Sequence, residues 1–211
     1  MKQVAVDGCG VAALTAASLL FERGMLLTEK HAASHSMVVA VPQDSLRLLQ
    51  EIWRLPESTF GFGRRLARRR VAWETDRFEA LDSSTTVFDP KVLAAALFEA
   101  LPSEVKAAPS QSAKGSDLVV IARGRGDSET ETVAAGARHA VVGRMDEARL
   151  FDRDAISIAS TSVGWLFATP SPHGDAAVML VRPGERICRD EAEDLCHATR
   201  RIFGADAVVD G

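Results

Sequence analysis

The feature that most constrains how this chain can fold is a glycine turn, Gly8-Cys9-Gly10, close to the N-terminus. A short, mostly apolar segment at 4–7 precedes the turn, and a run of small and apolar residues at 10–23 follows it. A second apolar segment, 25–28, then ends at Glu29. A strand, a tight turn, a helix and a second strand in this order predict a βαβ unit, whose two strands are parallel.

The residue types in the turn also point to a ligand. Gly8 permits a tight turn out of the strand, and Gly10 lets the backbone approach a pyrophosphate at the positive start of a helix. Ala13 is small enough for close contact between helix and strand. Glu29 lies 21 residues after Gly8, about where an acid meets the ribose hydroxyls of a bound dinucleotide. The pattern therefore predicts a dinucleotide site, and the alternative is a turn that only joins a strand to a helix.

Composition excludes several classes of protein. The 211 residues suffice for one sizeable domain or two small ones. The net charge of -4, without a basic tail, argues against bulk nucleic-acid binding. The 3 cysteines show no paired zinc spacing, which suits a reducing cytoplasm. No apolar run reaches the roughly 20 residues of a membrane span. We therefore expect a cytoplasmic protein that binds neither membrane nor nucleic acid.

The middle of the chain shows two helix starts and one strongly apolar strand. Asp44 or Ser45 can cap a helix that ends before Pro56, and Asp89-Pro90 combines a side-chain cap with a proline at the first helical position. The segment 117–122 is almost wholly apolar, which is typical of a strand buried on both faces of a parallel sheet.

Five arginines crowd into 64–70, just before two predicted short strands at 71–74 and 77–81. They could bind a phosphate or an acidic partner, and the simpler interpretation is an exposed strand edge. We expect Trp53 and Trp73 to be core residues, because large aromatic side chains contribute strongly to cores.

The last third of the chain reads mostly as strands. Helices and buried strands come first and strands dominate later, so the predicted fold class is α/β (α+β overall). It consists of a Rossmann-like layer with an attached, mostly antiparallel sheet on the substrate side. The predicted late elements are strands near 138–144, 154–160, 164–168 and 176–181 and a helix at 189–203. The predicted domains are 1–136, with a small β insertion at about 64–88, and 137–211.

Several of these segments resemble one known family. The N-terminal Val-x-Val-x-Gly-x-Gly-x-x-Ala, Glu29-Lys30, the helix start at Asp89-Pro90, and the stretches 116–125 and 164–170 are similar to FAD-dependent monooxygenases of the aromatic hydroxylase type. The wider superfamily includes flavin-dependent halogenases, geranylgeranyl reductases and lycopene cyclases. Halogenation is disfavoured, because Trp165-Leu166-Phe167 lacks the second tryptophan of the halogenase motif.

The resemblance implies FAD as the cofactor, with NAD(P)H as the reductant. The turn would hold the pyrophosphate, Glu29 the adenosine ribose, and Lys30 would lie beside the adenine. Arg123 replaces the aspartate of the family's second motif near the cofactor phosphates, although lycopene-cyclase-like members have a similar Ala-Arg-Gly. The implied cofactor-binding residues are Gly8, Cys9, Gly10, Val11, Ala12, Ala13, Glu29, Lys30, Ala122, Arg123 and Gly124.

One further motif is ambiguous. Gly174-Asp175 resembles the Gly-Asp motif that touches the flavin in family members, and 190–195 resembles the helix after it. The glycine-rich helix start between them is missing, and a hairpin turn beside Pro172 explains the same residues. Family members are usually much longer, so the chain looks like a shortened member.

The resemblance implies hydroxylation of an aromatic or polyketide-like small molecule with O2. No residue stands out as catalytic, because the cofactor supplies the difficult chemistry. We predict no metal site, since His31 and His35 have no third ligand nearby. One alternative is an NAD(P)-dependent reductase, weakened because a chain without tyrosine has no Tyr-x-x-x-Lys. The other is an inactive module that binds a nucleotide or a partner, and a homodimer or protein partner stays open.

Overall fold

The computed structural model divides into two compact units, each built from segments that alternate along the sequence. Unit 1 comprises Met1–His35, Arg47–Gly61 and Pro90–Thr132, and unit 2 comprises Ser36–Leu46, Phe62–Asp89 and Val133–Gly211. The predicted boundary near residue 136 assumed two contiguous domains, and that division stays a prediction. The structure describes residues 4–8, 10–20, 25–28, 37–73, 77–106, 116–122, 138–184 and 191–209.

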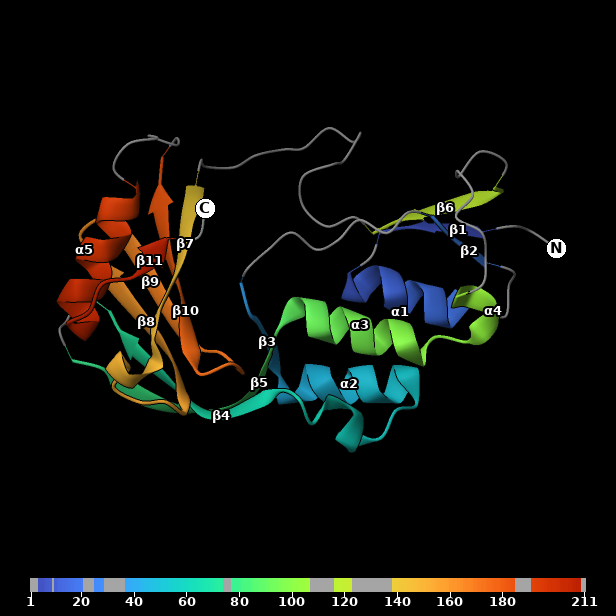
Figure 1. The fold of residues 1–211 in the computed structure, drawn as a ribbon, viewed down its shortest axis with the longest axis horizontal. Coiled ribbons are helices and arrows are strands. Elements are labelled where there is room, and N and C mark those ends of the chain that lie inside the picture. The colour runs from blue at the N-terminus through green and yellow to red at the C-terminus, as the bar shows by residue number, and fades with distance from the viewer. Residues whose placement is uncertain are drawn as a thin grey trace. The chain divides into compact units, whose positions relative to one another are not determined.

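Unit 1 contains the predicted βαβ unit. Strand β1 (Val4–Asp7) pairs in parallel with β2 (Met25–Thr28), and helix α1 (Val11–Leu20) connects them. On its other side β1 pairs in parallel with β6 (Leu118–Ile121), which gives the order β2-β1-β6. Central strand β1 is buried along its whole length. The glycine turn therefore follows the central strand of this sheet (Figure 1).

Helices complete unit 1. Helix α1 packs on β1 and β2 and also against α3 (Pro90–Ala100), which buries Leu93 and Leu97. Trp53, at the end of α2 (Gln43–Trp53), is 7% exposed and donates from its indole nitrogen to Thr15 Oγ1 at 3.1 Å, so its predicted core position is confirmed. The short helices η2 (Glu57–Phe60) and α4 (Ser103–Lys106) follow α2 and α3. Within the described ranges, no helix is long and apolar enough to cross a membrane.

The prediction that 117–122 is buried on both faces is wrong. In β6, Leu118 is 55% and Ile121 63% exposed, although the strand itself forms as expected. The reason is its position, because β6 is the outer strand of the sheet and α1 packs mainly on β1 and β2. Apolarity predicted the strand correctly, but it does not say which strands the helices cover.

Unit 2 contains an eight-stranded, mostly antiparallel sheet with the order β11-β7-β10-β9-β8-β4-β5-β3 among its described residues (Figure 1). Among the described strands of this sheet, only β4 and β8 pair in parallel. The short helix η3 (Glu147–Arg149) follows β7. The strands are β3 (Val39–Pro42), β4 (Arg64–Ala72), β5 (Glu79–Phe88), β7 (Arg138–Asp146), β8 (Ala155–Thr161), β9 (Gly164–Pro170), β10 (Asp175–Pro183) and β11 (Val208–Val209).

The arginine-rich segment is an inner strand of this sheet. Strand β4 pairs with β5 on one side and with β8 on the other, so the interpretation of 64–70 as a strand edge is wrong. The two strands expected as a small insertion therefore belong to the same sheet as the strands after residue 137. Local sequence shows no sign of this, because the partner of β4 lies far along the chain.

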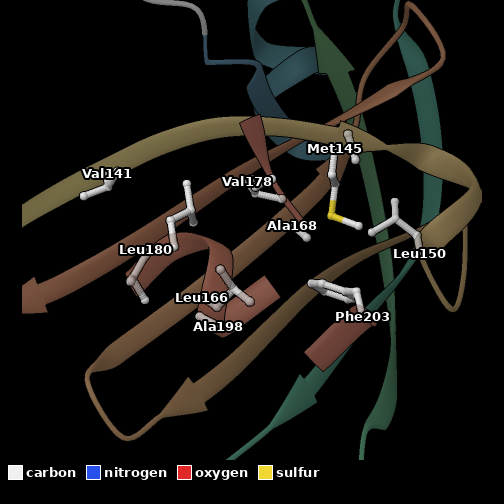
Figure 2. Packing of buried hydrophobic residues seen from close by; sticks show 12 residues of the cluster. Val141, Met145, Leu150, Leu166, Ala168, Val178, Leu180, Ala198 and Phe203 are labelled. Atoms are coloured by element: carbon white, nitrogen blue, oxygen red, sulfur yellow. The ribbon is translucent and has the colours of Figure 1, made fainter. Parts of the chain in front are cut away.

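Helix α5 (Glu191–Phe203) forms near its predicted position of 189–203 and covers one face of the sheet. Alternate residues of the central strands point toward it, because side chains of a strand alternate between faces. Figure 2 shows how these side chains meet those of α5. The resulting core consists of Val141, Met145, Leu150, Leu166, Ala168, Ala176, Val178, Leu180, Leu195, Ala198, Phe203 and Ala207.

Candidate functional site

The glycine turn brings together residues that the sequence placed in two separate motifs. Gly8 has a φ of 140°, in the region that favours glycine, and a Cβ there would lie 2.3 Å from the carbonyl oxygen of Ala122. The same Cβ would lie 3.1 Å from the Cβ of Ala13. The Ala122 N–H donates to the carbonyl oxygen of Asp7 at 2.7 Å, which extends the pairing of β1 with β6 into the turn. Gly8, Ala13 and Ala122 thus form one closely packed element.

Gly10 has a different environment. Among the described residues, a Cβ on Gly10 would meet no atom within 4 Å, so open space lies next to the start of α1. The N–H of Leu14 donates to the carbonyl oxygen of Gly10 at 3.0 Å, which marks the first turn of the helix. The first N–H groups of a helix have no partner within it, and they favour a negative charge. A pyrophosphate fits this position, because the backbone is accessible at Gly10 and Ala12 is exposed.

Several predicted cofactor-binding residues lie outside the described residues. These are Cys9, Glu29, Lys30, Arg123 and Gly124, and their roles stay predictions. His31 and His35 lie outside as well. Within the described part of the chain, no group of three His, Cys, Asp or Glu side chains could hold a metal ion.

Sequence reasoning gave no role to Asp7, which is buried at the end of β1 directly before Gly8. The sequence nevertheless marks Asp7, because it is the one acidic residue in an otherwise apolar strand. Its backbone carbonyl accepts from the N–H of Ala122, which ties Asp7 to the packed turn.

Gly174-Asp175 forms a hairpin, so the hairpin interpretation is confirmed and the comparison with a flavin-contacting motif is not supported. Gly174 has a φ of 87°, and the Ser171 N–H donates to the carbonyl oxygen of Asp175 at 2.8 Å, between antiparallel β9 and β10. The Asp175 carboxylate accepts from Ser171 Oγ and from Arg144 Nη1. Burial alone would raise the pKa of Asp175, but these hydrogen bonds outweigh it and hold the pKa below its ordinary value.

Most arginines of β4 have partners inside unit 2. Arg64 makes a two-pronged ion pair with Glu147, with Nη1 to Oε2 at 2.5 Å and Nη2 to Oε1 at 2.9 Å. This hydrogen bonding raises the pKa of Arg64, against the effect of burial. Arg68 pairs with Asp152 at 2.9 Å, and Arg70 lies 5.0 Å from the ring centre of Phe78. These three side chains stabilise the sheet, which leaves them poorly placed to bind a phosphate.

A second surface of interest is the sheet face that does not point toward α5, here called the opposite face. Apart from Ile156, which lies in a buried cluster with Leu66 and Val87, its large apolar side chains are half-buried or exposed. The strand registers align four of them in one row across β8, β9, β10 and β7. The opposite face comprises Ile158, Phe167, Met179 and Val142 in that row, with Trp165 and Val181 beside it.

At one end of the opposite face lies an aromatic cluster, formed by Trp73, Trp165 and Arg138. Trp73 is 54% exposed, so its predicted core position is wrong. Its ring meets that of Trp165 edge-on, with centroids 6.4 Å apart and an interplanar angle of 86°. The guanidinium of Arg138 lies 5.1 Å from the ring centre of Trp165.

Helix α5 lines a groove of about 420 Å³. Three of its lining side chains are engaged locally: Asp194 pairs with Arg182, Arg200 pairs with Asp206, and Cys196 donates to the carbonyl oxygen of Ala207. Glu193 and His197 complete the lining.

No family model and no curated protein matches this sequence. Its matches are to solved structures. The chain superposes on p-nitrophenol 4-monooxygenase from Pseudomonas putida DLL-E4 with a TM-score of 0.71 at 13% identity. It also superposes on a peptidyl tryptophan dihydroxylase essential for tryptophylquinone cofactor biogenesis, with a TM-score of 0.70 at 17% identity. A third match is 2-methyl-3-hydroxypyridine-5-carboxylic acid oxygenase, with a TM-score of 0.64 at 14% identity.

The chain has the fold of these oxygenases. It is covered over 100%, 99% and 100% of its length in the three comparisons. It spans 67%, 55% and 70% of the respective oxygenases. The predicted fold class is confirmed, and at this level of identity the likeness concerns the fold alone.

Proposed function

We propose that the chain binds FAD at the glycine turn and acts as an FAD-dependent oxidoreductase. The observation that carries this proposal is the geometry of the turn: Gly8 packs against Ala122, while Gly10 leaves open space at the start of α1. This is the arrangement that a dinucleotide pyrophosphate needs, because it combines a closely packed backbone with accessible N–H groups.

The residues divide into two groups by the support they have. Gly8, Gly10 and Val11–Ala13 would hold the pyrophosphate, with Ala122 at the rim, and the described geometry fits these roles. The roles of Glu29 and Lys30 at the adenosine end, and of Cys9, Arg123 and Gly124 near the phosphates, rest on the family resemblance. When bound, FAD supplies the redox chemistry that passes electrons from NAD(P)H to O2.

The more specific activity that we propose is monooxygenation of an aromatic or polyketide-like substrate. The three matched oxygenases are named for p-nitrophenol, a peptidyl tryptophan and a hydroxypyridine carboxylic acid, all of which contain an aromatic ring. The opposite face of unit 2 suits such a substrate, because its half-buried side chains offer apolar contact without a buried charge.

An absorption spectrum of the purified chain, followed by titration with FAD, tests the first step. We expect flavin bands, and Gly10→Val should lower the affinity for FAD at least tenfold with little change in stability, because the added side chain fills the space for the ligand. Ala16→Val, on α1 outside the turn, is the control. A chain that shows no flavin bands after FAD is added contradicts the proposal. A Gly10→Val variant that binds FAD like the parent contradicts it as well.

A second candidate function is a nucleotide-binding module that catalyses no turnover. The observation that favours it is the hairpin at Gly174-Asp175, which leaves the described residues without a second flavin-contacting motif. FAD-dependent oxidation of NADPH discriminates the two, since the module predicts none. Titration with NADPH alone examines the NAD(P)-dependent reductase, which predicts tight nicotinamide binding without flavin.

A further inference from the structure

The aromatic cluster of Trp73, Trp165 and Arg138 is assembled from strands that are far apart in sequence. Arg138 begins β7 and pairs with Pro183 of β10, while Trp165 pairs with Val181 two residues earlier. On its other side Trp165 pairs with Ser160 of β8. Trp73 directly follows β4, whose last residue, Ala72, pairs with Ala159. The sheet register therefore brings all three side chains to one end of the opposite face.

The exposure of the two indoles requires an explanation. Trp73 is 54% and Trp165 38% exposed, and both present apolar ring surface to solvent. Removing such surface from water favours binding. Two adjacent indoles are thus a ready contact for a flat apolar ligand, since aromatic rings prefer stacked or edge-on contacts with one another.

Arg138 differs from five other arginines of unit 2. Arg64, Arg68, Arg144, Arg182 and Arg200 each pair with a carboxylate. Arg138 has no carboxylate within ion-pair distance among the residues that the structure describes, and its guanidinium lies over the ring of Trp165. Packing on the indole restrains the guanidinium, whose N–H groups form a planar fork that matches a carboxylate.

We infer that the aromatic cluster is a binding subsite for an aromatic carboxylate. The ring of the ligand contacts the indoles of Trp73 and Trp165, and its carboxylate takes two N–H groups of Arg138. The inference rests on the proposed function only in naming this ligand as the substrate class, because the binding itself needs no cofactor. A small molecule suits the site better than a protein partner, since two indoles are far smaller than the roughly 800 Å² that each side of a stable protein interface buries.

The indole N–H signals in a two-dimensional NMR spectrum of 15N-labelled protein test this inference. The chain has 3 tryptophans, and Trp53 serves as an internal reference because it is buried in unit 1. Benzoate, added without FAD, should shift the signals of Trp73 and Trp165 saturably and leave that of Trp53 unchanged. Benzamide, which lacks the charge, and cyclohexanecarboxylate, which lacks the aromatic ring, should bind at least fivefold more weakly.

Two variants test whether the cluster recognises benzoate or whether its indoles respond only because they are exposed. Arg138→Met should weaken benzoate binding at least tenfold, and Trp73→Leu at least fivefold, while the unchanged Trp53 signal reports an intact fold. Equal binding of benzoate and benzamide, or an Arg138→Met variant that binds like the parent, overturns the inference. So does a response to an acidic aromatic peptide without any response to benzoate, which would indicate a protein partner. Titration of the same samples with FAD tests the proposed function separately.

Discussion

Gly8 and Gly10 lie two residues apart, yet glycine is needed for different reasons at the two positions. Gly8 is required by the fold, because its φ of 140° and the nearby carbonyl of Ala122 leave no room for a Cβ. Gly10 has neither constraint and has open space beside it. The proposed function accounts for glycine at Gly10 through a ligand that approaches the backbone, whereas glycine at Gly8 would be needed even without one.

Gly8→Ala should lower the free energy of unfolding by roughly 2–4 kcal/mol, because it adds backbone strain and a clash with the Ala122 carbonyl. Gly174→Ala is the matched control, since its φ of 87° is also unfavourable but no atom lies within 4 Å of the added Cβ. Its cost should be about 1 kcal/mol. Urea unfolding of both variants measures the difference, and equal costs would show that the contact with Ala122 is unimportant.

The lowered pKa of Asp175 predicts how the stability of the fold changes in acid. Its pKa in the folded protein lies below the ordinary value of 3.8. The interactions of the ionised carboxylate with Ser171 and Arg144 therefore stabilise the fold above about pH 4, and this contribution is lost as the pH falls further.

Asp175→Asn should accordingly be less stable than the parent at neutral pH and should lose less stability between about pH 4 and pH 2. Chemical unfolding at a series of pH values measures both effects. Asp206→Asn is the control: Asp206 also has a lowered pKa through Arg200, but water screens this exposed pair. An unchanged pH dependence in Asp175→Asn would contradict the assignment.

At the level of elements, local pattern predicted well which segments form helices and strands. The helix after Asp89 and the strands from 138 onward appear within a few residues of their predicted positions. The predictions that failed were those that depend on which residues are neighbours in space. Trp53 and Trp73 are the same residue type, yet one packs against α1 and the other lies exposed beside Trp165. The inner position of β4 also depends on β8, a partner that no local pattern identifies.

The same contrast between local pattern and spatial neighbours applies to the candidate site. The glycines of the turn were predicted because their spacing reflects local backbone geometry. The aromatic cluster was missed because its members come from three strands, and only the register of the sheet brings them together. At Gly174-Asp175 the sequence left a hairpin and a flavin-contacting motif open, because a two-residue motif recurs wherever a tight turn needs glycine.

Helix α5 is the element whose packing makes the clearest prediction. Leu195 is 0% exposed in the core between α5 and the sheet, so Leu195→Ala should lower the free energy of unfolding by roughly 2–5 kcal/mol. Leu48→Ala on α2 is the control, because Leu48 is 57% exposed and its loss should change stability by less than about 0.5 kcal/mol. Similar values for both variants in urea unfolding would contradict the packing of α5.

At the scale of the whole molecule, the two units are interleaved along the sequence. Segments 36–46 and 62–89 belong to unit 2, although unit 1 precedes and follows each of them. Their strands β3, β4 and β5 complete a sheet whose other strands lie after residue 137. Unit 2 thus depends on segments from both halves of the chain.

A fragment of residues 1–136 tests this interdependence. It keeps β3, β4 and β5 but loses β8, so we expect exposed strand edges and aggregation rather than cooperative folding. Circular dichroism and size-exclusion chromatography of the fragment, beside the full chain, measure the outcome. A soluble fragment with a cooperative thermal transition would instead support the contiguous domain boundary near residue 136.

The hydrogen bond from Ala122 to Asp7 also has a consequence for the order of events during synthesis. The ribosome translates the strand end that packs on Gly8 more than a hundred residues after Gly8 itself. Domains begin to fold while the chain is still emerging, but the turn has no packing partner at Ala122 until that strand has been made. The packed form of the turn is therefore completed long after its own residues are translated.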